Sequence, residues 1–348
     1  MTALKQKQSL RQSLSPQQVI QANILQLNIS VLEKKILDEL ESNPLLEQSV
    51  TEDESVESID ELETEVEYDQ DPDEYEPSNI YDNKNVQTAI QRQLENTSYA
   101  EIEARITEPD MLLAEKLIQL MPGDFQKKAW FGLSGSDAAE AAQRMVLASS
   151  GKSRILSFGG AMHGTNDTGM GLSGLPGAGG VKYGSHVIKA PFPDPYRSPF
   201  PGDSLGLADR CTSFIEDYLF KTICPPSDIA AVFVETVQSD SGDVVPPDNF
   251  MPLLRKLCDE HNILLAMDEV QTGFGRTGAN FAHQLFGVKP DLMGCGKAAG
   301  GGILPVSFVA GRKDVIDTLT PGSEGSTFGG YPLASVVGTY AIKIFTSF

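Results

Sequence analysis

Apolar residues at helical spacing open the chain, between residues 1 and 50. They recur three and four positions apart, the period of one face of a helix. A first helix is predicted after Ser15, a capping residue that is followed by proline. A second is predicted after Ser30, which opens a capping-box pattern, and Asn43-Pro44 ends it. We expect a short helical hairpin with little core of its own, which packs on a partner.

From about Glu108 to Phe348 the pattern changes, and short apolar runs alternate with helical repeats. Helices are predicted at residues 111–120, 137–148, 207–220 and 250–261. Strands are predicted at residues 154–158, 186–190, 230–235, 263–268, 292–295 and 307–310. This alternation predicts an α/β fold, with a mostly parallel sheet flanked by helices on both faces. Ligands of such sheets bind at the carboxyl ends of the strands.

An acidic stretch separates these two zones. Residues 52–76 hold fourteen acidic side chains and no basic one, which is two-thirds of the net charge of −21. Such a run repels itself and buries no core, so we expect a disordered linker and junction over residues 51–107. Within it, residues 85–94 are expected to form a short helix. The predicted domains are therefore 1–50, 51–107 and 108–348.

The composition argues against a membrane protein, an exported protein, a metal site and a nucleic-acid-binding protein. No apolar run approaches the length that spans a membrane, and the polar N-terminus lacks an apolar export segment, so we expect a cytoplasmic location. The four cysteines and four histidines are scattered, so no metal site is predicted. No cluster of Lys and Arg indicates direct binding of nucleic acid.

Two polar residues stand where ligands of this fold bind. Asp268 ends the predicted strand at 263–268; alone, it could equally be a helix cap or a turn residue. Lys297 follows the strand at 292–295 and precedes Gly300-Gly301-Gly302. Alone, it could be a solvent-facing loop lysine. A desolvated lysine at this place could lose its proton and form an imine with an aldehyde.

A third feature is the small-residue turn Gly135-Ser136, which opens an alanine-rich helix. The free N–H groups of a helix start suit a phosphate, although the same pattern is also an ordinary cap. Together the three features fit pyridoxal 5'-phosphate. Lys297 would take its aldehyde, Asp268 its ring nitrogen and the turn its phosphate. The ring accepts electrons when a carboxylate keeps its nitrogen protonated.

The sequence from Asp268 to Gly278, DEVQTGFGRTG, resembles the signature of the class III aminotransferases, which have fold type I. The resemblance spans residues 108–348. It includes further motifs at Met162-His163-Gly164, Glu235-Thr236-Val237-Gln238, Gly296-Lys297 and Ser326-Thr327-Phe328-Gly329-Gly330. It implies the large domain of a pyridoxal-phosphate-dependent aminotransferase. The family normally has further segments on both sides, so we expect a truncated domain.

The resemblance also implies roles for single residues. Lys297 corresponds to the catalytic Schiff-base lysine, which also carries the proton. Asp268 corresponds to the catalytic partner of the ring nitrogen. Val270 corresponds to the residue on one ring face, and Gln271 to the donor to the phenolic oxygen.

The remaining implied cofactor contacts lie elsewhere in the chain. Gly135 and Ser136 correspond to the phosphate turn, and Glu235 to an acidic residue near substrate and cofactor. Thr327 corresponds to a phosphate contact from a second subunit, which implies a homodimer. Met162 and His163 belong to the motif that covers the ring, although the family usually has an aromatic residue at Met162. Where Ser239 stands, glycine is usual in the family.

Residues 4–47, which end in Asn43-Pro44-Leu45-Leu46-Glu47, resemble the N-terminal regulatory region of the sigma-54 factor, the enhancer-dependent sigma factor. The acidic stretch, to about residue 80, resembles its acidic region. This implies contact of residues 1–50 with RNA polymerase or an activator ATPase. The chain then looks like a fusion of two incomplete families.

We therefore expect a transaminase that moves an amino group from an amine or omega-amino acid, such as 4-aminobutyrate, to a 2-keto acid. The segment PFPDPYR at residues 191–197 resembles members that act on terminal amines. A pyridoxal-phosphate aminomutase or racemase remains open, because these enzymes share the cofactor residues. A transcription-regulatory fragment and an inactive fusion remain open as well.

Overall fold

The computed structural model describes residues 84–97, 106–175, 186–320, 322–323 and 325–346. These belong to one unit of the chain, residues 76–348. The helical hairpin predicted within residues 1–50, and most of the predicted linker, lie outside the described residues.

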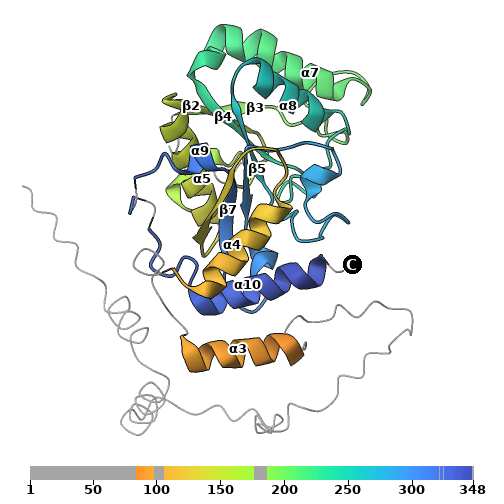
Figure 1. Cartoon of the computed structure of the whole chain (residues 1–348). Coiled ribbons are helices and arrows are strands. Elements are labelled where there is room, and N and C mark those ends of the chain that lie inside the picture. Colours follow the sequence, from red (N-terminus) through yellow and green to blue (C-terminus); the bar gives the residue numbers. More distant parts are fainter. Residues whose placement is uncertain (1–83, 98–105, 176–185, 321, 324, 347–348) are drawn as a thin grey trace, which may run out of the picture. The chain divides into compact units, whose positions relative to one another are not determined.

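A seven-stranded sheet forms the centre of this unit (Figure 1). Its order is β1 (Lys127–Gly132), β7 (Ser307–Arg312), β6 (Leu292–Cys295), β5 (Leu264–Asp268), β4 (Ile229–Glu235), β2 (Arg154–Phe158) and β3 (Val187–Ala190). Within this sheet β7 alone runs in the direction opposite to the other strands. The predicted fold class, an α/β fold with a mostly parallel sheet, is confirmed.

Helices cover both faces of the sheet. The helix α5 (Gly135–Ser150) packs on one face, and it also contacts α6 (Asp167–Leu172) and α9 (Lys313–Ile316). The other face is covered by α4 (Glu108–Leu120), α7 (Leu207–Ser213), η4 (Phe214–Ile223), α8 (Phe250–Glu260) and α10 (Pro332–Phe345). The helix α3 (Lys84–Asn96) packs on α10. Short 3-10 turns lie at Pro226–Asp228 (η5), Ala282–Gln284 (η6) and Lys297–Gly300 (η7).

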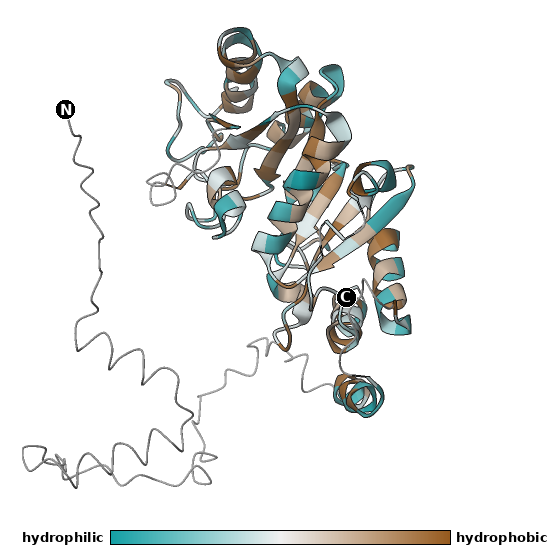
Figure 2. Ribbon diagram, turned by 90° about the vertical axis from the view of Figure 1, so that its left-hand side faces the viewer, coloured by the Kyte–Doolittle hydropathy of each residue, from teal (hydrophilic) through white to brown (hydrophobic). Residues whose placement is uncertain are grey.

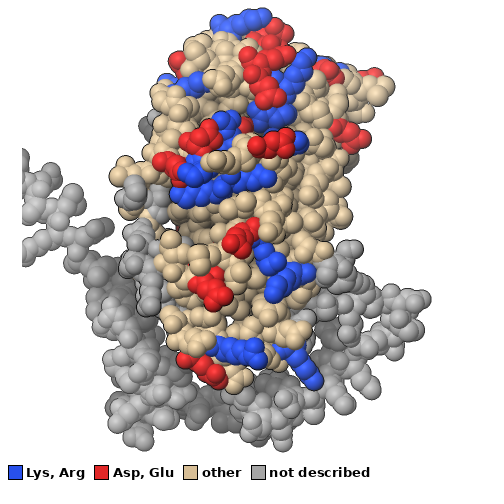
Figure 3. Space-filling view, viewed as in Figure 1, with Lys and Arg blue, Asp and Glu red and all other residues tan. Residues whose placement is uncertain are grey.

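The strands bury side chains on both faces. Leu265 and Met267 of β5 enter the core beneath α8, whereas Ala266 between them faces the α5 side. Figure 2 shows the strands largely in hydrophobic colours and the helices with hydrophilic outer faces. On the described surface in Figure 3, Lys and Arg lie interspersed with Asp and Glu.

Most predicted elements lie within a few residues of the observed ones, but there are differences. The single helix predicted at 207–220 is α7 followed by π-helical turns in η4. The strand β1, the helix α10 and the short helices α6 and α9 were not predicted. Among the described helices, none has both the length and the apolar character needed to cross a membrane.

Candidate active site

The carboxyl ends of β4 and β5 lie side by side, because Glu235 pairs in register with Asp268. A pocket of about 180 Å³ lies at this edge of the sheet. It is lined by Gly135, Ser136, Met162, His163, Gly164, Thr165, Glu235, Ser239, Asp240, Asp268, Val270, Gln271 and Lys297. Every predicted site residue except Thr327 lines this pocket. Thr327 is exposed, and it lies in a turn before α10.

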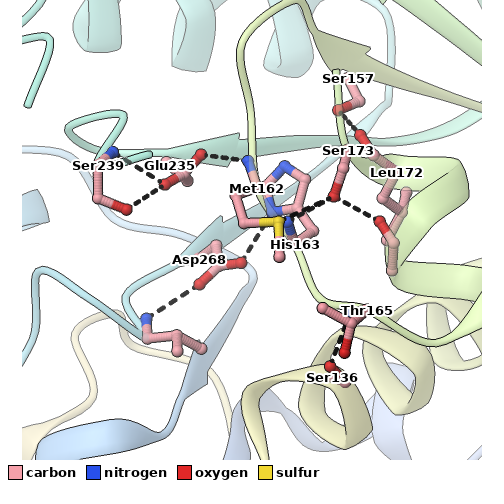
Figure 4. Close-up of polar contacts among 12 residues, drawn as sticks. Ser136, Ser157, Met162, His163, Thr165, Leu172, Ser173, Glu235, Ser239 and Asp268 are labelled. Atoms are coloured by element: carbon pink, nitrogen blue, oxygen red, sulfur yellow. Dashed lines mark hydrogen bonds and ion pairs between the residues drawn. The ribbon is translucent and has the colours of Figure 1, made fainter. Parts of the chain in front are cut away.

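Asp268 is held from two directions. Its Oδ2 lies 2.7 Å from Nδ1 of His163, and its Oδ1 accepts a hydrogen bond of 2.9 Å from the backbone N–H of Val270. The side chains of Asp268 and His163 point toward each other in Figure 4. The His163 side chain is fully buried, and its ring makes a T-shaped contact with the ring of Phe233. His163 therefore orients the Asp268 carboxylate.

The loop that carries His163 is itself fixed. The backbone N–H of His163 donates to Ser173 Oγ at 2.8 Å, and Ser173 Oγ donates to the carbonyl of Gly169 at 2.6 Å (Figure 4). Ser173 is buried at the end of α6. Its role was not predicted from the sequence, because nothing in the local pattern indicates that a serine ten residues from His163 contacts it.

Glu235 is a second buried carboxylate at this edge. Its Oε1 accepts a 2.7 Å hydrogen bond from the backbone N–H of Met162. Its Oε2 accepts from the backbone N–H and the hydroxyl of Ser239, at 3.2 and 3.3 Å (Figure 4). Burial raises the pKa of Glu235, whereas His163 lowers it. The hydroxyl of Ser239, which a glycine would lack, thus supplies Glu235 with an additional donor.

The start of α5 is a well-capped turn that approaches the sheet closely. Ser134 caps the helix, with its Oγ accepting from the N–H of Asp137 at 3.2 Å. A Cβ on Gly135 would lie 2.7 Å from Val270 Cγ1, so only glycine fits there without a shift. The hydroxyl of Ser136 accepts a 3.0 Å hydrogen bond from the N–H of Thr165. First-turn N–H groups of such a helix are available to an anion.

Lys297 follows β6 at the start of η7, and its backbone is in the left-handed region with φ of 41°. This conformation is uncommon for a residue other than glycine. The Lys297 Nζ donates a hydrogen bond to Oε1 of Gln271. Lys297 and Gln271 are both exposed, and both line the pocket. The amine is therefore accessible to a ligand that enters the pocket.

One further carboxylate was not predicted. Glu269 directly follows Asp268 and is fully buried, with four hydrogen-bond donors around it. Burial raises the pKa of Glu269, and these hydrogen bonds oppose that effect. Its place in the same sequence motif as Asp268 was the available signal.

The pocket thus combines the groups that the predicted cofactor requires. A helix start suits a phosphate, the carboxylate of Asp268 suits a protonated ring nitrogen, and the amine of Lys297 suits an aldehyde. All three meet around a single pocket, although they come from segments far apart in the sequence. Among the described residues, no group of His, Cys, Asp and Glu is arranged to hold a metal ion.

Two family models match the chain. The model described as "Aminotransferase class-III" matches residues 78–347. The model described as "Sigma-54 factor, Activator interacting domain (AID)" matches residues 3–48. Both resemblances found in the sequence are therefore confirmed.

Individual relatives and solved structures agree with the first match. The 5-aminovalerate aminotransferase DavT of Pseudomonas aeruginosa is 37% identical over 259 residues, 74% of this chain and 59% of the relative. The leucine/methionine racemase of Thermococcus litoralis is 38% identical over 257 residues, 73% of this chain and 57% of the relative. The taurine:2-oxoglutarate aminotransferase of Bifidobacterium kashiwanohense, solved with PLP and glutamate, superposes with a TM-score of 0.71 at 27% identity, covering 77% of this chain and 61% of that one. The chain thus spans somewhat less than two-thirds of each of these proteins.

Proposed function

Because this chain belongs to the class III aminotransferase family, we propose that it binds pyridoxal 5'-phosphate and transfers an amino group from an amine or omega-amino acid to a 2-keto acid. The observation that carries the proposal is the meeting of Lys297, Asp268 and the Gly135-Ser136 turn around one pocket. The name of the 5-aminovalerate relative supports a substrate with a terminal amine. Domain 108–348 would carry this activity, and its boundary stays a prediction.

Each part of the pocket would hold one part of the cofactor. The α5 start at Gly135 and Ser136 would bind the phosphate, and Asp268 would pair with the ring nitrogen. Val270 would pack on one ring face, and Gln271 would donate to the phenolic oxygen. When bound, the cofactor supplies an electron sink that permits a bond to the amine-bearing carbon to break.

The chain's own residues would then manage protons and orientation. Lys297 would take a proton from the substrate carbon and deliver it to a carbon of the cofactor. A positioned amine acts in this way in general acid–base catalysis. The contact from Gln271 keeps the Lys297 amine at the pocket. His163 and the N–H of Val270 keep the Asp268 carboxylate aligned. Met162, held through its backbone by Glu235, would cover the other ring face.

A homodimer is part of the proposal. Thr327 is exposed and does not line the pocket of its own chain. A second copy could therefore supply it to the phosphate. The cytoplasmic location expected from the sequence stays a prediction.

Cofactor binding can be tested on the purified full chain by titration with pyridoxal 5'-phosphate. We expect a visible absorption band that is absent in Lys297→Ala. A chain that shows no such band, or a variant that keeps it, would contradict the proposal. Amino transfer from 5-aminovalerate or 4-aminobutyrate to 2-oxoglutarate should follow. Interconversion of leucine enantiomers without any amino transfer would instead identify a racemase.

A second function is favoured by the sigma-54 match at residues 3–48. We propose that this segment contacts an activator ATPase or RNA polymerase. Pull-down of each candidate by the full chain, compared with a chain lacking residues 1–50, tests this. Equal capture by both chains would contradict it.

A further inference from the structure

The carboxylate of Glu269 bonds to the backbone of another segment. Its Oε1 accepts a hydrogen bond of 2.7 Å from the N–H of His283, and its Oε2 accepts one of 3.0 Å from the N–H of Ala282. Both donors belong to η6, near its start. A backbone N–H has no alternative role as an acceptor, so each of these two bonds needs an acceptor oxygen on the side chain of residue 269.

Two hydroxyl donors complete the set around Glu269. Thr236 Oγ1 donates to Oε1 at 3.2 Å, and Thr272 Oγ1 donates to Oε2. Thr236 directly follows Glu235 at the end of β4. The Glu269 side chain therefore joins the ends of two strands to η6 and, through Thr272, to the turn that begins at residue 270. A fully buried carboxylate is tolerated only when it is satisfied in this way.

The residues on either side of Glu269 face the pocket. Asp268, Val270 and Gln271 line it, whereas Glu269 does not. We propose that Glu269 is a positioning residue for the cofactor. By fixing the backbone between Asp268 and Gln271, it keeps the Asp268 carboxylate toward His163 and the Gln271 amide toward Lys297. The inference rests on the proposed function, because it concerns the same pocket.

The substitution Glu269→Gln tests this with almost no change of shape. An amide offers one acceptor oxygen and one NH₂ group. Whichever way it turns, the NH₂ group faces the N–H of Ala282 or of His283, and that N–H loses its partner. The threonine hydroxyls can rotate to accept, but the backbone cannot. One of the two hydrogen bonds from η6 to residue 269, next to Asp268, is therefore lost.

Asp291→Asn is the matched control. Asp291 is also buried, and its Oδ2 accepts from the N–H of Leu265 at 2.8 Å and from Arg255 at 2.7 Å. This contact holds β5 at the end opposite to Asp268. Asp291 is therefore a buried carboxylate at the end of a strand, like Glu269, but it lies away from the pocket. Thr272→Val is a milder variant, because it removes one donor and leaves the Glu269 carboxylate in place.

The experiment titrates the full chain and its variants with pyridoxal 5'-phosphate, and measures the thermal unfolding of each without cofactor. For Glu269→Gln we expect the cofactor dissociation constant to rise about tenfold, the effect of one lost hydrogen bond. We also expect the pH midpoint of the bound cofactor's visible band to shift. Thr272→Val should show a smaller change in the same direction. Asp291→Asn should lower the unfolding temperature and leave both cofactor readouts within about twofold of the wild type.

The outcomes separate this inference from the proposed function. A wild-type chain that fails to bind the cofactor overturns the proposed function. A wild-type chain that binds, with Glu269→Gln losing only thermal stability, overturns the positioning role alone. The same holds if Asp291→Asn changes the cofactor readouts as much as Glu269→Gln does. Should Glu269→Gln fail to fold, Thr272→Val decides between the two results.

Discussion

The histidine beside Asp268 can be tested at the scale of a single residue. In His163→Leu, Asp268 loses its 2.7 Å partner and retains only the N–H of Val270. We expect the dissociation constant for pyridoxal 5'-phosphate to rise about tenfold, from the loss of about 1.5 kcal/mol. In His163→Asn an amide N–H can replace Nδ1, so most of the affinity should return. Equal affinities for the two variants, measured by titration, would count against this role for His163.

Glu235 gives a prediction for pH. Burial raises its pKa above the ordinary value of 4.5. A carboxyl with a raised pKa in the folded state stabilises the fold below the unfolded-state pKa, and this contribution is lost as pH rises through the folded-state value. Without cofactor, Glu235→Gln should therefore gain stability relative to the wild type as the pH rises from about 4.5 toward neutral. Denaturant unfolding across this range measures the difference, and parallel curves would contradict the shift.

Some of the residues that form the site could be predicted from the sequence. Asp268 ends one apolar strand and Lys297 closely follows another, so their place at one edge of the sheet followed from the α/β pattern. The partners of Glu269 could not be found this way. These partners are Thr236, Thr272 and η6. They contact Glu269 only because separate loops pack against one another above the sheet.

At the scale of elements, the close approach of α5 to the signature loop gives another prediction. In Gly135→Ala the added Cβ would lie 2.7 Å from Val270, and relieving this overlap should cost about 1–3 kcal/mol and weaken phosphate binding. The control is Gly151→Ala at the other end of α5. Gly151 has φ of 64° and nothing within 4 Å of an added Cβ, so strain of about 1 kcal/mol is expected without any effect on cofactor affinity. Comparable affinity losses in the two variants would refute the proposed importance of the close approach.

Two of the elements that were not predicted, β1 and α10, gave weak sequence signals for different physical reasons. The strand β1 (KKAWFG) lies at the sheet edge, and because its first two residues are lysines, its apolar run is shorter than those that marked the inner strands. The helix α10 contacts α4, α3 and η7, so it is buried on several sides and lacks one clear polar face. Inner strands such as β4, buried throughout, gave the clearest signal.

At the scale of the whole molecule, the proposed dimer predicts complementation. Thr327→Ala should weaken cofactor binding about tenfold, because one phosphate contact is lost. A mixture of the Thr327→Ala and Lys297→Ala chains would form mixed dimers in which one site has both Lys297 and Thr327. We expect tight cofactor binding with the visible band to return in that fraction. A monomer by sedimentation, or a mixture without recovery, would refute the shared site.

The reversed direction of β7 has a consequence for the order of folding. Antiparallel neighbours need no crossover helix, so β6 and β7 are joined directly by residues 296–306, which include Lys297. The His163–Asp268 contact instead closes a separation of 105 residues. Because shorter loops lose less entropy on closure, we expect the lysine segment to become structured before the ring-nitrogen partner is in place. In pulsed hydrogen exchange during refolding, amides of β6 and β7 should then gain protection before that of Met162, which donates to Glu235 across 73 residues.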